Sequence, residues 1–166
     1  MRFVPEKPLF KTVLCACVFA VLGSYAHAVP VAWQLNNFDL LDGGDAMGVF
    51  TYDADTNTYS DVSITTTAGT ISGNPFPGAS YSFVRNDSFV SPSATFVSLL
   101  ATSGPDFTGV SNFAMQFDGP LTNAGGTLGL NFFTEAICAN ADCSLVNVGG
   151  RGVVSSPNSA TVTSIE

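Results

Sequence analysis

From Val31 onward, the chain consists of short runs rich in Val, Ile, Thr, Phe and Tyr, separated by clusters of Gly, Asn, Asp, Pro and Ser. Runs of this kind form β-strands, and the clusters between them are typical of turns. No window in this part repeats apolar residues at helical spacing over ten residues. We therefore predict an all-β chain, in which only residues 134–141 favour a short helical turn.

Individual runs show how the strands use their two faces. In the run 113–117, Phe113, Met115 and Phe117 alternate with smaller or polar residues, so one face should pack and the other should be wet. The runs 48–52 and 59–67 are predicted to pair as a hairpin, because the six residues between them supply the side-chain acceptors that stabilise turns. In all we predict nine strands, over residues 31–38, 48–52, 59–67, 80–84, 95–101, 113–117, 128–132, 152–155 and 160–165. The stretches 72–80 and 91–93, rich in Pro, Gly and Ser, are predicted to be exposed loops.

The N-terminus has the three parts of a secretory signal. A positive region, formed by Arg2, Lys7 and Lys11, precedes an apolar run and then a small-x-small site at Ala26 and Ala28. The apolar run has ten residues, whereas a membrane-spanning helix needs ~20. We therefore predict that residues 1–28 are a signal peptide cleaved after Ala28. An alternative, lipid attachment at Cys17, is disfavoured because the apolar stretch before this cysteine is short and interrupted by Lys11.

Cleavage at this point would leave residues 29–166, a length of 138 residues that suits one domain with its own core. Many short antiparallel strands at this length favour a single antiparallel β-sandwich or jelly-roll-like domain over parallel βαβ units.

The charge of the predicted exported chain excludes several partners. It keeps two basic and 12 acidic residues, a formal net charge of −10, and contains no Lys and no His. Such a surface repels phosphate backbones and anionic lipids, so we expect no nucleic-acid partner. No apolar run approaches the ~20 residues that spanning requires, so we expect no stable membrane span in the mature chain.

Two cysteines, Cys138 and Cys143, lie in the predicted exported chain. Export would place them in an oxidising compartment. A zinc site would need further Cys or His ligands, which this part of the chain lacks. We therefore predict a disulfide between Cys138 and Cys143.

The sharpest local pattern is Asp53-x-Asp55-x-Asn57, whose oxygen spacing is that of the opening of a calcium loop. Thr58 and Ile64 stand where an EF-hand needs Gly and Glu, so the pattern is no EF-hand. Two interpretations stay open: a Ca²⁺ site, or a hairpin turn stabilised by its own Asp and Asn side chains. The acidic cluster Asp39, Asp42 and Asp45 offers the same two alternatives, a cation site or a solvated loop.

Catalytic side chains are scarce. Without His, Lys or a free thiol, the usual general bases and nucleophiles are missing, so we expect a non-enzymatic protein with no catalytic residue and no obligatory cofactor. One remote alternative is a glycoside hydrolase that uses carboxylates alone, with Glu135 beside an Asp. Glu135 is equally well suited to pair with Arg151.

A second alternative function is glycan binding. Trp33, Tyr52 and Tyr81, with Tyr59, could form a platform for stacking on sugar rings. Most of the other aromatic residues are Phe, which lacks a polar group and belongs in a core.

One part of the sequence is similar to a known group. It contains Trp33-Gln34-Leu35, then Asp42-Gly43-Gly44-x-Ala46-x-Gly48-x-Phe50-x-Tyr52-Asp53-Ala54-Asp55-Thr56-x-Thr58-Tyr59, then Ile64-Thr65-Thr66-Thr67-Ala68-Gly69. The chain thereby resembles the exported bodies of PEP-CTERM proteins, which are Gram-negative proteins sorted by exosortase.

The resemblance implies a place at the cell surface or in an exopolysaccharide matrix, with extracellular polysaccharide as the partner. It assigns no catalytic residue. The sequence ends at Glu166 without the Pro-Glu-Pro motif, apolar helix and Arg cluster of such proteins. We therefore expect either a truncated member or one that is secreted without sorting.

Overall fold

The structure is a computed structural model that describes residues 28–71, 74–147, 150–152 and 159–165. These residues form β-strands, turns and loops and contain no helix. The strands are β1 (Val31–Asn36), β2 (Phe38–Asp39), β3 (Asp45–Asp53), β4 (Thr58–Thr66), β5 (Gly69–Ile71), β6 (Asn74–Phe76), β7 (Ser80–Tyr81), β8 (Phe83–Val84), β9 (Phe96–Leu100), β10 (Ser111–Phe117), β11 (Thr127–Ile137) and β12 (Thr161–Ile165). The predicted all-β class is confirmed. The predicted signal lies, except for Ala28, outside the described residues.

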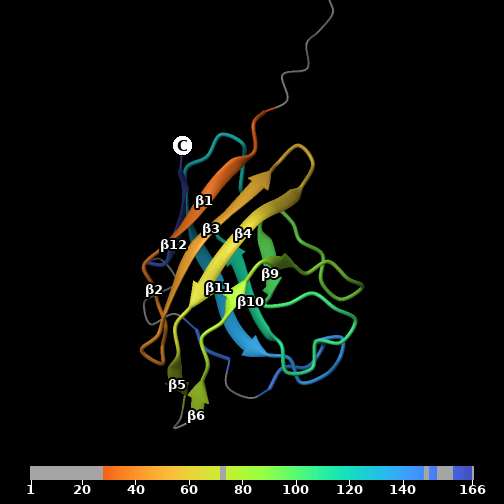
Figure 1. The fold of residues 1–166 in the computed structure, drawn as a ribbon. Coiled ribbons are helices and arrows are strands. Elements are labelled where there is room, and N and C mark those ends of the chain that lie inside the picture. Colours follow the sequence, from red (N-terminus) through yellow and green to blue (C-terminus); the bar gives the residue numbers. More distant parts are fainter. Residues whose placement is uncertain (1–27, 72–73, 148–149, 153–158, 166) are drawn as a thin grey trace, which may run out of the picture.

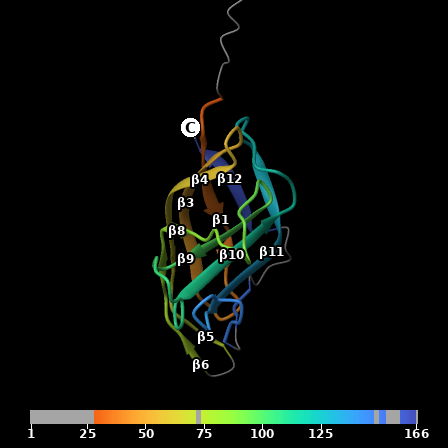
Figure 2. The ribbon, with the colours of Figure 1, turned by 90° about the vertical axis from the view of Figure 1, so that its right-hand side faces the viewer.

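One ten-stranded antiparallel sheet contains most of the strands, in the order β7-β4-β3-β1-β12-β11-β10-β9-β8, with β2 added beside β3. The long strand β11 turns this sheet into two layers, because residues 127–129 pair with β12 whereas residues 130–137 pair with β10. The two end strands of the order, β7 and β8, are separated only by Ser82 in the chain. The sheet therefore wraps almost fully around, as Figures 1 and 2 show, into the predicted sandwich-like shape.

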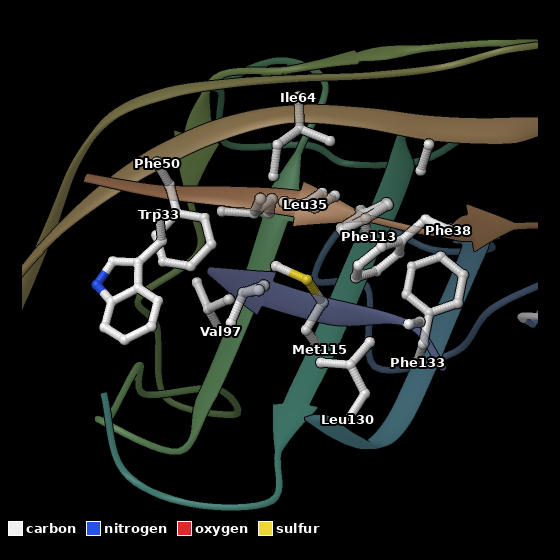
Figure 3. Packing of buried hydrophobic residues seen from close by; sticks show 14 of the residues in the cluster. Trp33, Leu35, Phe38, Phe50, Ile64, Val97, Phe113, Met115, Leu130 and Phe133 are labelled. Atoms are coloured by element: carbon white, nitrogen blue, oxygen red, sulfur yellow. The ribbon is translucent and has the colours of Figure 1, made fainter. Parts of the chain in front are cut away.

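The core lies between the two layers (Figure 3). Phe113, Met115 and Phe117 of β10 are all buried, which confirms the face predicted from their alternation. The Phe113 ring stacks with Phe38 and meets Phe133 edge-on, with ring centroids 6.5 and 4.7 Å apart. Each fully buried ring of this size contributes about 1.5–3 kcal/mol relative to exposure. The close contact between rings from β2, β10 and β11 thus holds the two layers together.

The predicted hairpin is also confirmed. β3 and β4 pair from Asp53 and Thr58 to Ala46 and Thr66, with a bulge opposite residues 49–51. The predicted first strand begins too late, at Gly48, whereas β3 begins at Asp45. A Cβ at Gly48 would lie 2.1 Å from the carbonyl oxygen of Ser63, so glycine permits this close approach of the two strands.

Two local predictions are wrong. Residues 134–137 continue strand β11 instead of forming a helical turn, because they complete its pairing with β10. The predicted loop 72–80 contains strand β6, which pairs with β5 in a separate hairpin. Pro75 argued against a strand in the sequence, because proline has no N–H to donate. A two-stranded hairpin accommodates proline at a position where no partner needs that N–H. The predicted strand at residues 152–155 lies outside the described residues except for Gly152.

A second, smaller apolar cluster lies apart from the main core. Leu100 packs there against Cys138 and Cys143, with Phe107 and Val110 beside them. Cys138 and Cys143 form the predicted disulfide, with their Cα atoms 4.8 Å apart. The disulfide therefore belongs to a small apolar cluster of its own, separate from the main core.

Candidate functional site

A buried polar cluster joins five parts of the chain. It consists of Asp42 before β3, Thr66 at the end of β4, Tyr81 of β7, Glu135 of β11, and Arg151, whose backbone pairs with that of Glu135. We call these residues the Arg151 cluster. The side chains of Asp42, Glu135 and Arg151 are each 0% exposed. Buried charges persist in proteins only when they are paired and hydrogen-bonded.

Arg151 is the centre of the cluster. Its Nε donates to Oε2 of Glu135 at 2.6 Å, its Nη1 to Oδ2 of Asp42 at 2.8 Å, and its Nη2 to the Thr67 carbonyl at 2.6 Å. Of the two alternatives that the sequence left open for Glu135, the structure shows the pairing with Arg151. All three nitrogens of the guanidinium group are therefore engaged inside the protein.

The hydrogen-bonding groups of Glu135 also all have partners inside the protein. Its Oε1 accepts hydrogen bonds from the Thr66 hydroxyl at 2.7 Å and from the Tyr81 hydroxyl. Its backbone N–H and C=O both pair with Arg151, at 2.9 and 2.7 Å. Both carboxylate oxygens thus have partners, and no part of the side chain reaches solvent.

The electrostatics of the cluster favour charged Arg151 and neutral Tyr81. Burial alone would lower the pKa of Arg151, but the hydrogen bonds and charges of Asp42 and Glu135 outweigh it, so this pKa is raised above its usual value. Burial, followed by the negative charge of Glu135, raises the pKa of the Tyr81 hydroxyl. Tyr81 therefore acts as a donor to Glu135 over the whole physiological range.

Two glycines and one ring enclose the cluster. A Cβ at Gly69 would lie 2.0 Å from Oδ2 of Asp42, and a Cβ at Gly44 would lie 2.8 Å from Nη1 of Arg151. The ring of Phe76, on β6, lies under the guanidinium carbon at 4.7 Å. The hairpin β5–β6 thus covers the charged groups, which gives this unpredicted element a structural purpose.

This arrangement does not fit the hydrolase alternative. A glycosidase needs two carboxyl groups that face a sugar bond across an open space. Here Asp42 does lie near Glu135, but the Arg151 side chain occupies the space between them and bonds to both. The Arg151 cluster is built to hold chain segments together.

The predicted sugar platform is wrong. Trp33, Tyr52 and Tyr81 are each only 1% exposed, so their ring faces are unavailable to a ligand. Trp33 and Leu35 lie on the same side of β1, and Tyr52 lies on the same side of β3 as Phe50, so these rings follow their strands into the core.

At the predicted calcium loop, the side chains bond to one another. Asp53 accepts the backbone N–H of Asp55 at 2.9 Å and the hydroxyl of Thr56 at 2.8 Å. Asn57 has φ of 53° and accepts the Tyr52 hydroxyl at 2.8 Å. The hydrogen bond from Thr56, with those from the backbone, lowers the pKa of Asp53. These contacts are those of the self-stabilised hairpin turn that the sequence offered as the second interpretation.

The acidic cluster divides in the structure. Asp42 turns inward to Arg151, whereas Asp39 and Asp45 remain exposed and lie opposite each other on β2 and β3. Across the ranges that the structure describes, no group of three or more His, Cys, Asp or Glu side chains is arranged to hold a metal ion.

A second arginine holds the disulfide loop. Arg85, 5% exposed, donates through Nη2 to the Asp142 carbonyl at 2.7 Å, through Nη1 to the Cys143 carbonyl at 3.2 Å, and through Nε to Asp87 at 2.6 Å. Partial burial would raise the pKa of Asp87, but the Arg85 bond and the N–H groups of Phe89 and Val90 lower it overall. Nothing in the local sequence signals this contact, since Asp142 and Cys143 lie 57 and 58 residues after Arg85 in the chain.

Two shallow hollows lie next to this arginine. They have volumes of about 210 and 240 Å³ and share Val84 and Asn86 in their walls. Sequence reasoning missed both, because their walls come from segments that are far apart in the chain.

Comparisons with known proteins add no assignment. No protein-family model matches the chain, and no curated protein or solved structure does so either. In the described part of the chain, no helix is both long and apolar enough to cross a membrane. The fold and the site define an antiparallel all-β domain with a disulfide and a buried ionic cluster.

Proposed function

We propose that this protein is an exported, non-enzymatic structural component of the bacterial cell surface or of the exopolysaccharide matrix around it. The observation that carries the proposal is the Cys138–Cys143 disulfide, in a chain whose first 28 residues read as a secretory signal. Disulfides persist in oxidising compartments and are rare in the cytosol.

The buried ionic cluster supports the structural part of the proposal. Glu135, the carboxylate best placed by sequence for catalysis, has both oxygens bonded and is 0% exposed. The Arg151 cluster instead joins strands β4, β7 and β11 to the segments that contain Asp42 and Arg151. A rigid body of this kind suits a protein that persists outside the cell.

The surface charge supports the extracellular part. The predicted exported chain carries 12 acidic and two basic residues, and both basic side chains are buried in ion pairs. The surface therefore presents carboxylates without opposing cations, which keeps the protein hydrated and repels polyanions. Its partner in a matrix would be a neutral polysaccharide.

Fractionation of the organism that encodes the chain tests this proposal. Cytosol, membranes, washed matrix and medium are separated, and the protein is detected in each fraction by an antibody. We expect it in the matrix fraction, and we expect polysaccharide-degrading enzymes to release it. Detection mainly in the cytosol, or in the medium with none retained by the matrix, would contradict the proposal.

A further inference from the structure

The two hollows beside Asn86 form one surface feature, which we call the Asn86 groove. One hollow lies between the start of β4 and strand β8, and the other lies between β8 and the loop after β9. β4 pairs with β7 only at Ile64 and Thr65, so the earlier part of β4 leaves space beside β8. The walls of the groove include the side chains of Tyr59, Phe83, Asn86, Ser103 and Phe107.

Hydrogen-bonding groups in the groove are free. Within the described residues, neither the side-chain amide of Asn86 nor the hydroxyl of Ser103 makes a hydrogen bond inside the protein. Asn86 lines both hollows, so its amide can donate and accept on either side. Polar groups of this kind, few and convergent, set the orientation of a ligand in a pocket.

The groove offers no free charge. Arg85 and Asp87 line one hollow but are paired with each other at 2.6 Å. The other two nitrogens of Arg85 each donate to a carbonyl of the disulfide loop, and Asp87 also accepts from the backbone N–H groups of Phe89 and Val90. An anion would therefore find no cation here, on a domain that is strongly acidic. The ligand that fits is neutral.

Apolar walls complete the site. Phe83 is 40% exposed and Phe107 is half-buried on the rim of the 210 Å³ hollow. Tyr59 is half-buried in the other, its hydroxyl bonded to the Ser93 carbonyl at 2.6 Å. An aromatic ring beside amide and hydroxyl groups matches a sugar, which presents an apolar ring face and polar edges. Each hollow is smaller than the ~300–1,000 Å³ that drug-sized ligands need, and so suits a single ring.

A larger hollow, of about 720 Å³, is less suitable. It lies at the ends of β1 and β12 and is walled in part by residues 28–32. Cleavage after Ala28 would remove part of that wall. Its other residues include no aromatic side chain.

We propose that the Asn86 groove binds a neutral oligosaccharide, with one sugar ring against Phe83 and the next between Asn86 and Tyr59. The inference deepens the proposed matrix role and rests on it for the source of the glycan. The predicted sugar platform consists of rings that are buried in the structure. The Asn86 groove instead offers rings that solvent reaches.

The test uses the purified full-length export product on an array that carries neutral oligosaccharides (cellohexaose, mannohexaose, maltohexaose) and anionic ones (alginate and hyaluronan fragments). Hits are then measured by calorimetry. We expect binding to at least one neutral oligosaccharide and none to the anionic ones. Phe83→Ala and Asn86→Ala should each weaken binding by about tenfold, the loss of one stacking or bidentate contact.

Phe132→Ala is the matched control, because Phe132 is 47% exposed, close to the value for Phe83, and lies on β11 outside both hollows. It should bind as the unchanged protein does. Unaltered fluorescence of Trp33 would show that each variant is folded.

Three results would overturn the proposal that the Asn86 groove binds a neutral oligosaccharide. These are no binding to any neutral oligosaccharide, a preference for an anionic glycan, and equal binding by the Phe83 and Phe132 variants. These results are separate from the fractionation. If the protein is retained in the matrix but shows no binding that depends on the groove, only the proposal of oligosaccharide binding in the groove is rejected. If binding depends on the groove but the protein is found in the cytosol, only the proposed matrix role is rejected.

Discussion

Replacement of Arg151 by methionine should be the most destabilising single change to the charged residues. The variant Arg151→Met keeps most of the side-chain volume but leaves the carboxylates of Asp42 and Glu135 buried without a counter-charge. Removal of one partner from a buried ion pair costs about 3–5 kcal/mol, because the remaining charge is left in a poorly polar medium. Here one change orphans two carboxylates, so we expect a loss of about 4 kcal/mol or more.

That loss is a large part of the ~5–15 kcal/mol by which a domain of this size is usually stable. With a urea dependence of about 2 kcal/mol per molar, the unfolding midpoint should fall by about 2 M. Trp33 is the single tryptophan and is 1% exposed, so its fluorescence follows unfolding of the core. Urea titrations of both proteins at neutral pH give the difference directly.

A triple variant is the control. Asp42→Asn and Glu135→Gln, added to Arg151→Met, remove the orphaned charges, so the triple variant should be more stable than Arg151→Met alone. If Arg151→Met does not fold, Asp42→Asn alone should still cost about 1.5–3 kcal/mol, the range for a hydrogen bond to a charged group. A loss below about 1 kcal/mol for Arg151→Met, or a triple variant no more stable than it, would refute the reasoning.

Three further predictions concern processing, the disulfide and pH. Intact-mass analysis of the exported protein should give an N-terminus at Val29, and retention of residues 1–28 would contradict the assigned signal. Maleimide should not label the exported protein without reductant, and loss of the Cys138–Cys143 bridge by Ser replacement should cost about 2 kcal/mol, as expected for a short loop; labelling of the unreduced protein would argue against the bridge. The pKa of Asp87 is lowered in the fold. The ionised Asp87 carboxylate therefore adds its full contribution to the free energy of unfolding above the ordinary pKa of 3.8, and this contribution is lost as the pH falls through the lowered pKa. Urea midpoints should therefore fall less steeply below pH 4 in Asp87→Asn, and equal slopes would exclude this contribution.

The sequence predicts those parts of the fold that depend on local pattern. Alternation over 113–117 identified the buried face of β10, and the Asp-rich turn after Tyr52 identified the β3–β4 hairpin. The predicted export and the lack of further zinc ligands indicated the disulfide between Cys138 and Cys143. For the strand face and the hairpin, a single short segment carries the physical cause.

The errors arise where a residue type is ambiguous. The glycan-binding alternative needs Trp33 and Tyr52 at a surface, because their rings suit sugars. Each shares a strand face with an apolar neighbour, Leu35 or Phe50. Strand phase outweighs residue type, since the period of a strand fixes which side chains share a face. That signal was present in the sequence.

Other features have no local signal. The Asn86 groove combines the start of β4 with β8 and the loop after β9, which meet only because the sheet wraps around. The carbonyls that Arg85 holds and the carboxylate of Asp42 that Arg151 holds are likewise distant in sequence. Without related sequences, only the assembled sheet reveals such contacts.

The most direct test of a non-enzymatic structural role is the chain-length distribution of the matrix polysaccharide. The gene is deleted in its own host, and polysaccharide from deleted and complemented cells is compared by size-exclusion chromatography, together with the amount retained on the cells. We predict less retained polysaccharide in the deletion and an unchanged length distribution. Longer polysaccharide in the deleted cells, or shortening of purified polysaccharide by the added protein, would contradict the account and identify a hydrolase.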